Sequence, residues 1–346
     1  MERGNQVTIR DVAKLANVSV ASAGRALGNY GKISEKTKEK VLKAAEELHY
    51  IPNKLAQGMR SHSTKTIAVV VPDIQNNFFG AIVAAIDQKA RERGYAVLIS
   101  NTSENRELEL DCLEMLAAKQ VDGFLLASTF TDKREIPEKY IRTIFDKFPV
   151  VTYDRKINGL PLVSVLTDNY AMAYTVTKYL TDLGHEEIVT IGSERGNAVS
   201  NTIRERERGY QAALREANIS YDGMCITVDW QKPVEAKRKI NILLDYHKVT
   251  AIVVLNNSVT GEVLNVLDER NIKFPEQISV VTWDDEERNN FMKMTSVRQP
   301  CKKIGELATT SLIDQIEGRD LTSEELTITL NQNLVKRESC MFHKKY

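Results

Sequence analysis

The densest group of ionisable side chains in the sequence is an acidic run, Asp284-Asp285-Glu286-Glu287. Neighbouring carboxylates are the groups that acid–base catalysis or a divalent cation would use. No nucleophile, metal-ligand spacing or phosphate-binding loop accompanies the run. We therefore interpret it as the acidic first turn of a helix, where the helix dipole favours negative charge. An α/β enzyme is the weakest hypothesis for this chain.

The cysteine, histidine and glycine patterns give no cofactor site. The five histidines are scattered without a His-Glu-x-x-His motif, and Gly192 and Gly196 belong to no nucleotide-binding glycine pattern. We expect no metal, no cofactor and no disulfide framework. The four cysteines are far apart and form no Cys-x-x-Cys pair: Cys112, Cys225, Cys301 and Cys340.

A second set of polar and aromatic side chains follows the ends of expected β-strands, with one arginine near the start of an expected helix. Phe79 and Trp230 are suited to sandwich a ring, while polar neighbours hydrogen-bond its rim. Each residue alone fits a capping or core role, but their joint occurrence at strand ends favours a binding site. The candidate ligand-binding residues are Asp73, Asn77, Phe78, Phe79, Asp154, Arg206, Trp230, Asn256 and Asp284.

The elements that must position these residues alternate between strand and helix from Lys65 onward. This alternation is typical of a doubly wound parallel sheet. The pattern is long enough for two sheets, which predicts two lobes with a cleft at the carboxyl ends of the strands. The expected strands are 66–71, 95–100, 122–127, 149–153, 187–191, 225–228, 251–255 and 279–283, and the expected helices are 79–93, 104–118, 134–146, 169–183, 204–217, 234–246 and 259–270.

The first sixty residues follow a different, all-helical pattern. Thr8 and Asp11 have the spacing of a capping box, Asn17 tolerates a left-handed turn, and Ser19 can cap a second helix. Two short helices joined by a tight turn match the helix-turn-helix motif, although an ordinary three-helix core has the same pattern. The expected helices cover 8–16, 19–27 (burying Val20 or Ala23, and Leu27) and 34–49 (with the apolar stripe Val41, Leu42, Ala45 and Leu48).

Length and charge support two or more domains. The 346 residues carry no net charge, yet residues 1–64 hold 11 Lys+Arg against 6 Asp+Glu. A basic head on an acidic body suits phosphate contact by the head alone. No apolar run approaches the roughly 20 residues of a membrane span, and the N-terminus lacks the apolar stretch of a secretory signal. We expect a cytoplasmic protein.

The head closely resembles the lactose-repressor (LacI/GalR) family. The resemblance is carried without gaps by Val7 to Ser19, Arg25, Ile33-Ser34, Thr37, Val41 and the segment from Leu48 to Asn53, and it continues at lower density to the C-terminus. It implies that Val20, Ala21 and Ser22 face base edges and that Arg25 completes the reading helix. It also implies that phosphates are held by Thr8, Ser19, Lys32, Ser34 and Thr37.

The same resemblance makes residues 53–60 a hinge helix that orders on DNA. Met59 then occupies the position of a wedge between minor-groove bases, a role that Met is known to take. Asn53 and Ala56 would contact DNA beside it. A disordered linker is the alternative for the free protein.

Two motifs in the larger domain, Gln120-Val121-Asp122-Gly123 and Leu183-Gly184-His185, each precede an expected strand and resemble the same family and the periplasmic sugar-binding proteins. The resemblance implies that the candidate ligand-binding residues line an effector cleft. His185, after Gly184, fits a structural role at a helix end. This chain has Asn256-Asn257 where relatives usually carry Asn-Asp, and Glu186 where they carry a cation. With Arg206 and the nearby Arg195 and Arg204, the lost negative charge favours an anionic ligand such as a sugar acid over a neutral sugar.

We therefore expect a repressor of carbohydrate-utilisation genes that binds a palindromic operator as a homodimer, without a tetramerising tail. The alternative is a sugar-binding protein without DNA function. The predicted domains are a helix-turn-helix domain (1–52), a hinge and linker (53–64) and an effector-binding and dimerisation domain (65–346). Within the last, we expect a first lobe of about 65–166 and 296–327 and a second lobe of about 167–295 and 328–346.

Overall fold

The computed structural model describes residues 7–28, 31–50, 63–194, 199–220, 222, 224–319 and 326–343. Its internal contacts divide the chain into two units, Met1–Lys65 and Thr66–Tyr346. The predicted hinge residues Asn53, Ala56 and Met59 lie outside the described residues. No described helix is long and apolar enough to cross a membrane.

The first unit contains three described helices, α1 (Ile9–Leu15), α2 (Val20–Gly28) and α3 (Glu35–Glu47). The Thr8 backbone N–H and hydroxyl both donate to Asp11 Oδ2, at 2.8 and 2.7 Å, which confirms the predicted box at the start of α1. Asn17 has φ 52°, as the tight turn before α2 requires. The small core that the three helices share consists of Val12, Ala13, Ala16, Ala23, Ala26, Val41, Ala44 and Ala45.

One apolar expectation in this unit was wrong, and one alternative is decided. Leu42 is exposed, and Ala44 takes its place in the core, because α3 turns its Val41–Ala44–Ala45 face toward α1 and α2. Val20 is exposed as well, so Ala23 is the buried residue of that pair. The core is thus built mainly from alanine, which lets the helices approach closely.

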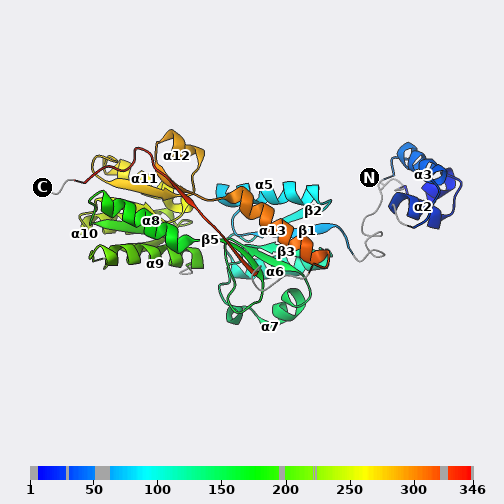
Figure 1. Ribbon diagram of the computed structural model, residues 1–346, viewed down its shortest axis with the longest axis horizontal. Helices are drawn as coiled ribbons and strands as arrows, with labels where there is room; N and C mark the ends of the chain where they lie inside the picture. The colour runs from blue at the N-terminus through cyan, green and yellow to red at the C-terminus, as the bar shows by residue number, and fades with distance from the viewer. Residues whose placement is uncertain are drawn as a thin grey trace. The chain divides into compact units, whose positions relative to one another are not determined.

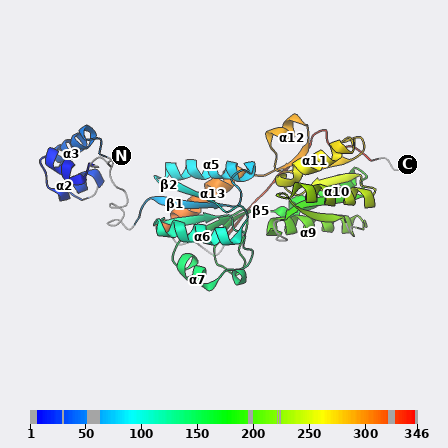
Figure 2. The ribbon, with the colours of Figure 1, turned by 180° about the vertical axis from the view of Figure 1, so that it is seen from behind.

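The second unit begins with a six-stranded parallel sheet (Figure 1). α5 (Asn77–Glu92) and α13 (Cys301–Ile316) cover one face, where Val69 and Leu125 point, and α6 (Arg106–Ala118) covers the other, where Val70 and Leu126 point (Figure 2). The strands, in spatial order, are β11 (Thr327–Leu330), β5 (Val163–Thr167), β4 (Val150–Tyr153), β3 (Gly123–Leu126), β1 (Thr66–Val71) and β2 (Ala96–Asn101).

A second six-stranded sheet forms the other lobe and is parallel except for its antiparallel β10–β12 pair. α8 (Asn169–Asp182) and α9 (Asn201–Glu216) pack on one face, and α10 (Pro233–Tyr246) and α11 (Thr260–Glu269) pack on the other. The strands, in spatial order, are β12 (Asn333–Val335), β10 (Thr295–Arg298), β9 (Ser279–Trp283), β8 (Ala251–Val254), β6 (Ile188–Glu194) and β7 (Cys225–Asp229).

The chain passes between the lobes three times, after β5, after β10 and after β11. β10 reaches Arg298 in the second sheet and β11 reaches Leu330 in the first, so two predicted lobe boundaries fall three residues before the strand ends. The domain limits themselves stay a prediction.

One expected helix is wrong. Residues 134–146 form a 3-10 turn (η1, Lys133–Glu135), a single helical turn (α7, Glu138–Tyr140) and a π-helical segment (η2, Ile141–Phe145). Pro137 separates the first two, because the residue before a proline is pushed out of the helical region; Ile136 has φ −92° and ψ 127°.

Candidate functional sites

The candidate DNA-contact residues in the described part of the head are mostly exposed. Ser19 Oγ accepts the backbone N–H of Ser22 at 3.1 Å and so caps α2. Ser34 Oγ accepts the N–H of Thr37 at 3.3 Å and caps α3 in the same way. These bonds fix the first turns of both helices. Ser22 and Thr37 are half-buried, and the exposed candidates are Thr8, Ser19, Val20, Ala21, Arg25, Lys32 and Ser34.

Arg25 has the loosest polar contact of this set. Its Nη2 lies 3.5 Å from Ser22 Oγ, the upper limit for a hydrogen bond. The stem of Arg25 passes over Gly31, where an added Cβ would lie 3.2 Å from Arg25 Cδ. Packing of the aliphatic part of Arg25 against Gly31 therefore positions the guanidinium, while its N–H groups remain available to donate to another partner.

Eight of the nine candidate ligand-binding residues line one cavity between the two lobes: Asp73, Phe78, Phe79, Asp154, Arg206, Trp230, Asn256 and Asp284. Asn77 does not. It lies in a neighbouring pocket with Asp285 and Arg288, because α5 begins at Asn77 and turns that side chain away. Asn76, the residue that caps α5, lines the cavity instead.

The cavity between the lobes encloses about 50 Å³. A water molecule occupies roughly 30 Å³ of the liquid, and sites for drug-sized ligands measure roughly 300–1,000 Å³. The inner cavity is therefore closed to a sugar-sized ligand, which would need the lobes to separate or would extend into the adjoining outer cavity of about 830 Å³.

Arg206 is the central cation of the cavity and is 4% exposed. Its Nε donates to Asn169 Oδ1 at 2.7 Å, its Nη1 donates to the Leu255 carbonyl at 2.5 Å, and its guanidinium lies 4.3 Å from the Trp283 ring centre. Burial lowers the pKa of Arg206 to about 10. The side chain thus remains a cation at neutral pH and is held from three directions.

Two carboxylates face Arg206. Asp154 and Asp284 follow β4 and β9 with φ 62° and 65°, a left-handed conformation that Asp tolerates better than most residues. Burial raises the pKa of Asp284 to about 6, against the opposing effects of Arg206 and of Gln299, whose Nε2 donates to Asp284 Oδ1 at 2.5 Å. Burial also raises the pKa of Asp154. Both groups could accept hydrogen bonds from ligand hydroxyls.

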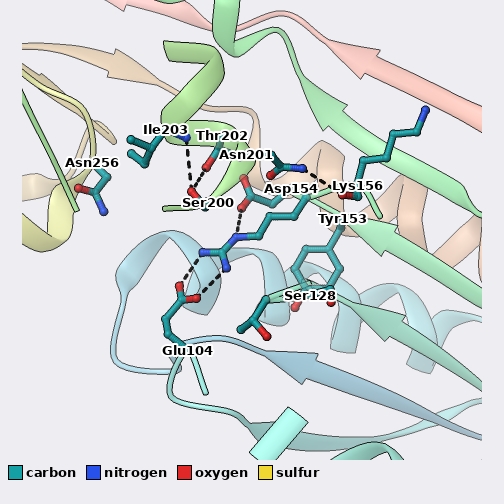
Figure 3. A network of polar contacts seen from close by, with 12 residues as sticks. Glu104, Ser128, Tyr153, Asp154, Lys156, Ser200, Asn201, Thr202, Ile203 and Asn256 are labelled. Carbon is teal, nitrogen blue, oxygen red and sulfur yellow. Dashed lines mark hydrogen bonds and ion pairs between the residues drawn. The ribbon is translucent and has the colours of Figure 1, made fainter. Parts of the chain in front are cut away.

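A half-buried ion pair that the sequence analysis missed lines the cavity, and Figure 3 shows its Glu104 beside Asp154. Arg155 Nη1 and Nη2 donate to the two carboxylate oxygens of Glu104 at 2.7 and 2.6 Å, and Arg155 Nε lies 3.5 Å from Asp154 Oδ2. Burial opposes the charge of Arg155, but Glu104 raises its pKa above the usual range. The one signal in the sequence was the position of Arg155 directly after Asp154.

Amide side chains join the two lobes across the cavity. Asn76 Nδ2 donates to Asn257 Oδ1 at 2.9 Å, and Asn257 Nδ2 donates back to Asn76 Oδ1 at 2.8 Å. Asn257 Nδ2 also donates to Glu286 Oε1 at 2.8 Å. On the other side, Asn201 Nδ2 donates to the Lys156 carbonyl at 3.0 Å (Figure 3). We call the first pair the amide clasp.

The acidic run has a different explanation from the one expected. α12 (Glu287–Phe291) does begin there, but only Glu287 lies in its first turn. Asp284 lines the cavity, and Asp285 is an ion-pair partner of Arg298 and Arg337 at 2.6 and 2.8 Å. Among the described residues, no group of three His, Cys, Asp or Glu side chains could hold a metal ion.

His185 has the structural surroundings expected of it. The side chain is buried, with Nδ1 3.0 Å from Thr250 Oγ1 and Nε2 3.1 Å from the Met341 carbonyl. Burial lowers the pKa of His185 to about 4, so the ring is neutral near pH 7. It ties the C-terminal segment to the second lobe.

Comparisons with known proteins match both the head and the larger part of the chain. Residues 8–53 match the model of bacterial regulatory proteins of the lacI family, and residues 177–340 match a periplasmic binding protein-like domain. The sucrose operon repressor of Pediococcus pentosaceus is 31% identical over 330 residues, covering 95% of this chain and 98% of the repressor.

Solved structures share the fold. The lac repressor dimer bound to operator and an anti-inducer has a TM-score of 0.83 at 23% identity, covering 97% of this chain and all of that one. The transcriptional regulator CelR in complex with cellobiose has a TM-score of 0.68 at 26% identity, covering 96% of this chain and 99% of that one. From the match of its head and its similarity to the sucrose operon repressor along nearly its whole length, this chain belongs to the lacI family of bacterial regulatory proteins.

Proposed function

We propose that the protein is a repressor of carbohydrate-utilisation genes whose affinity for its operator is set by a small polar effector in the cavity between the lobes. The observation that carries this proposal is the convergence of Arg206, Asp154 and Asp284 on one inter-lobe cavity in a chain that also has a helix-turn-helix head. A regulator of this kind acts in the cytoplasm, with its DNA, and has no need of catalysis.

In the proposed complex, the start of α2 lies in the major groove. Val20 and Ala21 contribute apolar contacts to thymine methyl groups, and Arg25 uses its free donors on guanine. The remaining head candidates hold phosphates, and the hinge residues Asn53, Ala56 and Met59 contact the minor groove. A head this small reads a half-site, so the protein binds a palindrome as a homodimer.

The effector is proposed to be a sugar. The inner cavity is lined by four carboxylates (Asp73, Glu104, Asp154 and Asp284) and two guanidinium groups (Arg155 and Arg206). This excess of acceptors favours ligand hydroxyls over an anionic group. It weighs against the sugar acid that the sequence suggested, because Arg204 does not line the inner cavity but an adjoining outer one of about 830 Å³, and Arg195 lies outside the described residues. CelR and the sucrose operon repressor support a sugar by their names.

The test begins with selection of bound duplexes from a random DNA pool by the full chain. The enriched operator is then used in gel shifts, alone and with each member of a panel of sugars and sugar acids that have first been screened by thermal shift. We expect a palindromic consensus and one or more neutral sugars that change both the melting temperature and the operator affinity. Failure to enrich any sequence would contradict the DNA half, and a preference for sugar acids would contradict the effector half.

A further inference from the structure

The three chain crossovers between the lobes are joined by one buried hydrogen-bond cluster, the crossover triad of Thr167, Gln299 and Gln332. Each residue belongs to a different crossover: Thr167 ends β5, Gln299 follows β10, and Gln332 lies between β11 and β12. Gln332 Nε2 donates to Gln299 Oε1 at 2.8 Å and to Thr167 Oγ1 at 2.9 Å, and Thr167 Oγ1 donates to Gln299 Oε1 at 3.2 Å. All three side chains are buried.

The triad contacts Asp284 directly, and it reaches Arg206 through one intermediate residue, Asn169. Gln299 Nε2 donates to Asp284 Oδ1 at 2.5 Å. Asn169 Nδ2 donates to the Thr167 carbonyl at 3.3 Å, while Asn169 Oδ1 accepts from Arg206 Nε at 2.7 Å. A continuous chain of contacts thus runs from Asp284 through the triad to Arg206.

We infer that Gln299 and Asn169 are positioning residues that tie Asp284 and Arg206 to the crossover triad, so that the charge arrangement in the cavity and the angle between the lobes change together. This inference rests on the proposed function only in treating the cavity as the effector site. Rotation of the lobes must alter the crossovers, because they are the only covalent links between the sheets among the described residues. A change in the crossovers therefore alters the hydrogen bonds from Gln299 to Asp284 and from Arg206 to Asn169.

The polar side chains of the crossover triad make the crossovers sensitive to movement of the lobes. A buried hydrogen-bond network is sensitive to small displacements, because each lost partner leaves a polar group without compensation. Gln332 Oε1 is already buried without a partner among the described residues. A rotated arrangement that supplied a donor to this oxygen would gain a hydrogen bond that the described arrangement lacks.

The experiment uses the full chain without DNA or sugar, so its failure would leave the proposed function untouched. The chain has two tryptophans, and both report on the cavity: Trp230 lines it and Trp283 lies against Arg206. Their emission is followed between pH 4.5 and 8, where Asp284 titrates with a pKa of about 6. The D284N variant lacks the titrating carboxyl group, so the change in emission that disappears in this variant is the one caused by Asp284.

In Gln332→Leu, which changes the triad but not the cavity lining, Gln299 loses an anchor and its bond to Asp284 weakens. We expect the midpoint of the emission step to rise by about half a pH unit, the effect of weakening one ordinary hydrogen bond to the ionised form. Thr167→Val, which keeps the side-chain shape, should shift it in the same direction. Quenching of the emission by acrylamide should increase in both variants as the lobes separate more readily.

Gln315→Leu is the matched control, because Gln315 lies in α13 outside the triad and its Nε2 is also buried without a partner among the described residues. It should leave the midpoint and the quenching unchanged. Circular dichroism verifies that each variant is folded. An unchanged midpoint in folded Thr167→Val and Gln332→Leu, or an equal shift in Gln315→Leu, overturns the inference.

Discussion

Arg25 and Arg206, the central arginines of the two candidate sites, have opposite surroundings. Arg25 is exposed and its polar contact, 3.5 Å long, is to a residue three positions away. Arg206 is buried, and its partners Asn169 and Leu255 lie 37 and 49 positions away. The head presents a side chain that the fold hardly uses, whereas the cavity presents a side chain on which the fold also depends.

This difference determines what substitution can reveal. A change at an exposed side chain alters binding and leaves stability within about 0.5 kcal/mol. A change at a buried, paired charge alters both, so its effect on binding must be separated from its effect on the fold. Substitutions in the head should therefore change binding alone, whereas substitutions in the cavity should also change stability.

The largest effect is expected for Arg206→Ala. The substitution removes the hydrogen bonds to Asn169 Oδ1 and the Leu255 carbonyl and also the cation that lowers the pKa of the buried Asp154 and Asp284. Removing the counter-charge of a buried group costs roughly 3–5 kcal/mol. The free energy of unfolding, measured in urea at pH 7, should fall by that amount. Arg208→Ala, on the exposed side of the same helix, should cost less than about 1 kcal/mol. Equal losses in the two variants would place Arg206 among ordinary surface residues.

The second prediction concerns pH and Asp284. Because burial raises its pKa to about 6, the folded state binds a proton between pH 4 and 6 more readily than the unfolded state does. By linkage, the ionised Asp284 lowers the free energy of unfolding above pH 6, and protonation restores that free energy as the pH falls. Relative to Asp284→Asn, the wild type should gain about 1.4 kcal/mol per pH unit below 6, up to roughly 3 kcal/mol. Parallel stability profiles for the two proteins would contradict the raised pKa.

The sequence predicted the head better than the cavity, for a physical reason. The capping box and the turn depend on residues within three positions of one another, such as Thr8 and Asp11. Both partners of the interaction can therefore be recognised in the local sequence. The cavity was found in part, because parallel strands gather their carboxyl ends at one edge. The Arg155–Glu104 pair spans 51 positions and the Gln332–Thr167 bond spans 165, and no local pattern encodes such partners.

The strands that the sequence did not predict have the same origin. β5, β10, β11 and β12 are short strands at or near the crossovers, and they are three to five residues long. Such runs carry little periodicity and become strands only when a neighbouring strand supplies hydrogen bonds. Asn77 was mistaken for Asn76 because the expected start of α5, at Phe79, lay two residues too late to show which asparagine capped the helix.

In the head, Arg25→Ala should weaken binding to the selected operator by roughly 1–3 kcal/mol, because a bidentate contact to guanine is lost. Lys32→Ala should weaken operator and random DNA alike and reduce the salt dependence by about one ion. Gel shifts across a salt series measure both effects, and urea unfolding should detect almost no change in stability. If Arg25→Ala lost equal affinity for both DNAs, Arg25 would be a phosphate contact.

The smallest effect is expected at the amide clasp, where Asn257→Asp restores the residue that relatives usually carry. The carboxylate still accepts from Asn76 Nδ2, but the donations from Asn257 Nδ2 to Asn76 Oδ1 and to Glu286 Oε1 disappear. Glu286 then faces a second negative charge. The closed arrangement of the lobes should lose about 1 kcal/mol, the net value of an ordinary hydrogen bond.

This loss is measurable as a larger open fraction in small-angle X-ray scattering of the ligand-free protein at pH 7. Asn265→Asp adds the same charge at an exposed position of α11 and serves as the control. Because the clasp joins the lobes directly and Asn265 does not line the cavity, only the first variant should open the molecule. Identical scattering from both variants would mean that the crossovers and the Asn201–Lys156 hydrogen bond, rather than the clasp, hold the lobes closed.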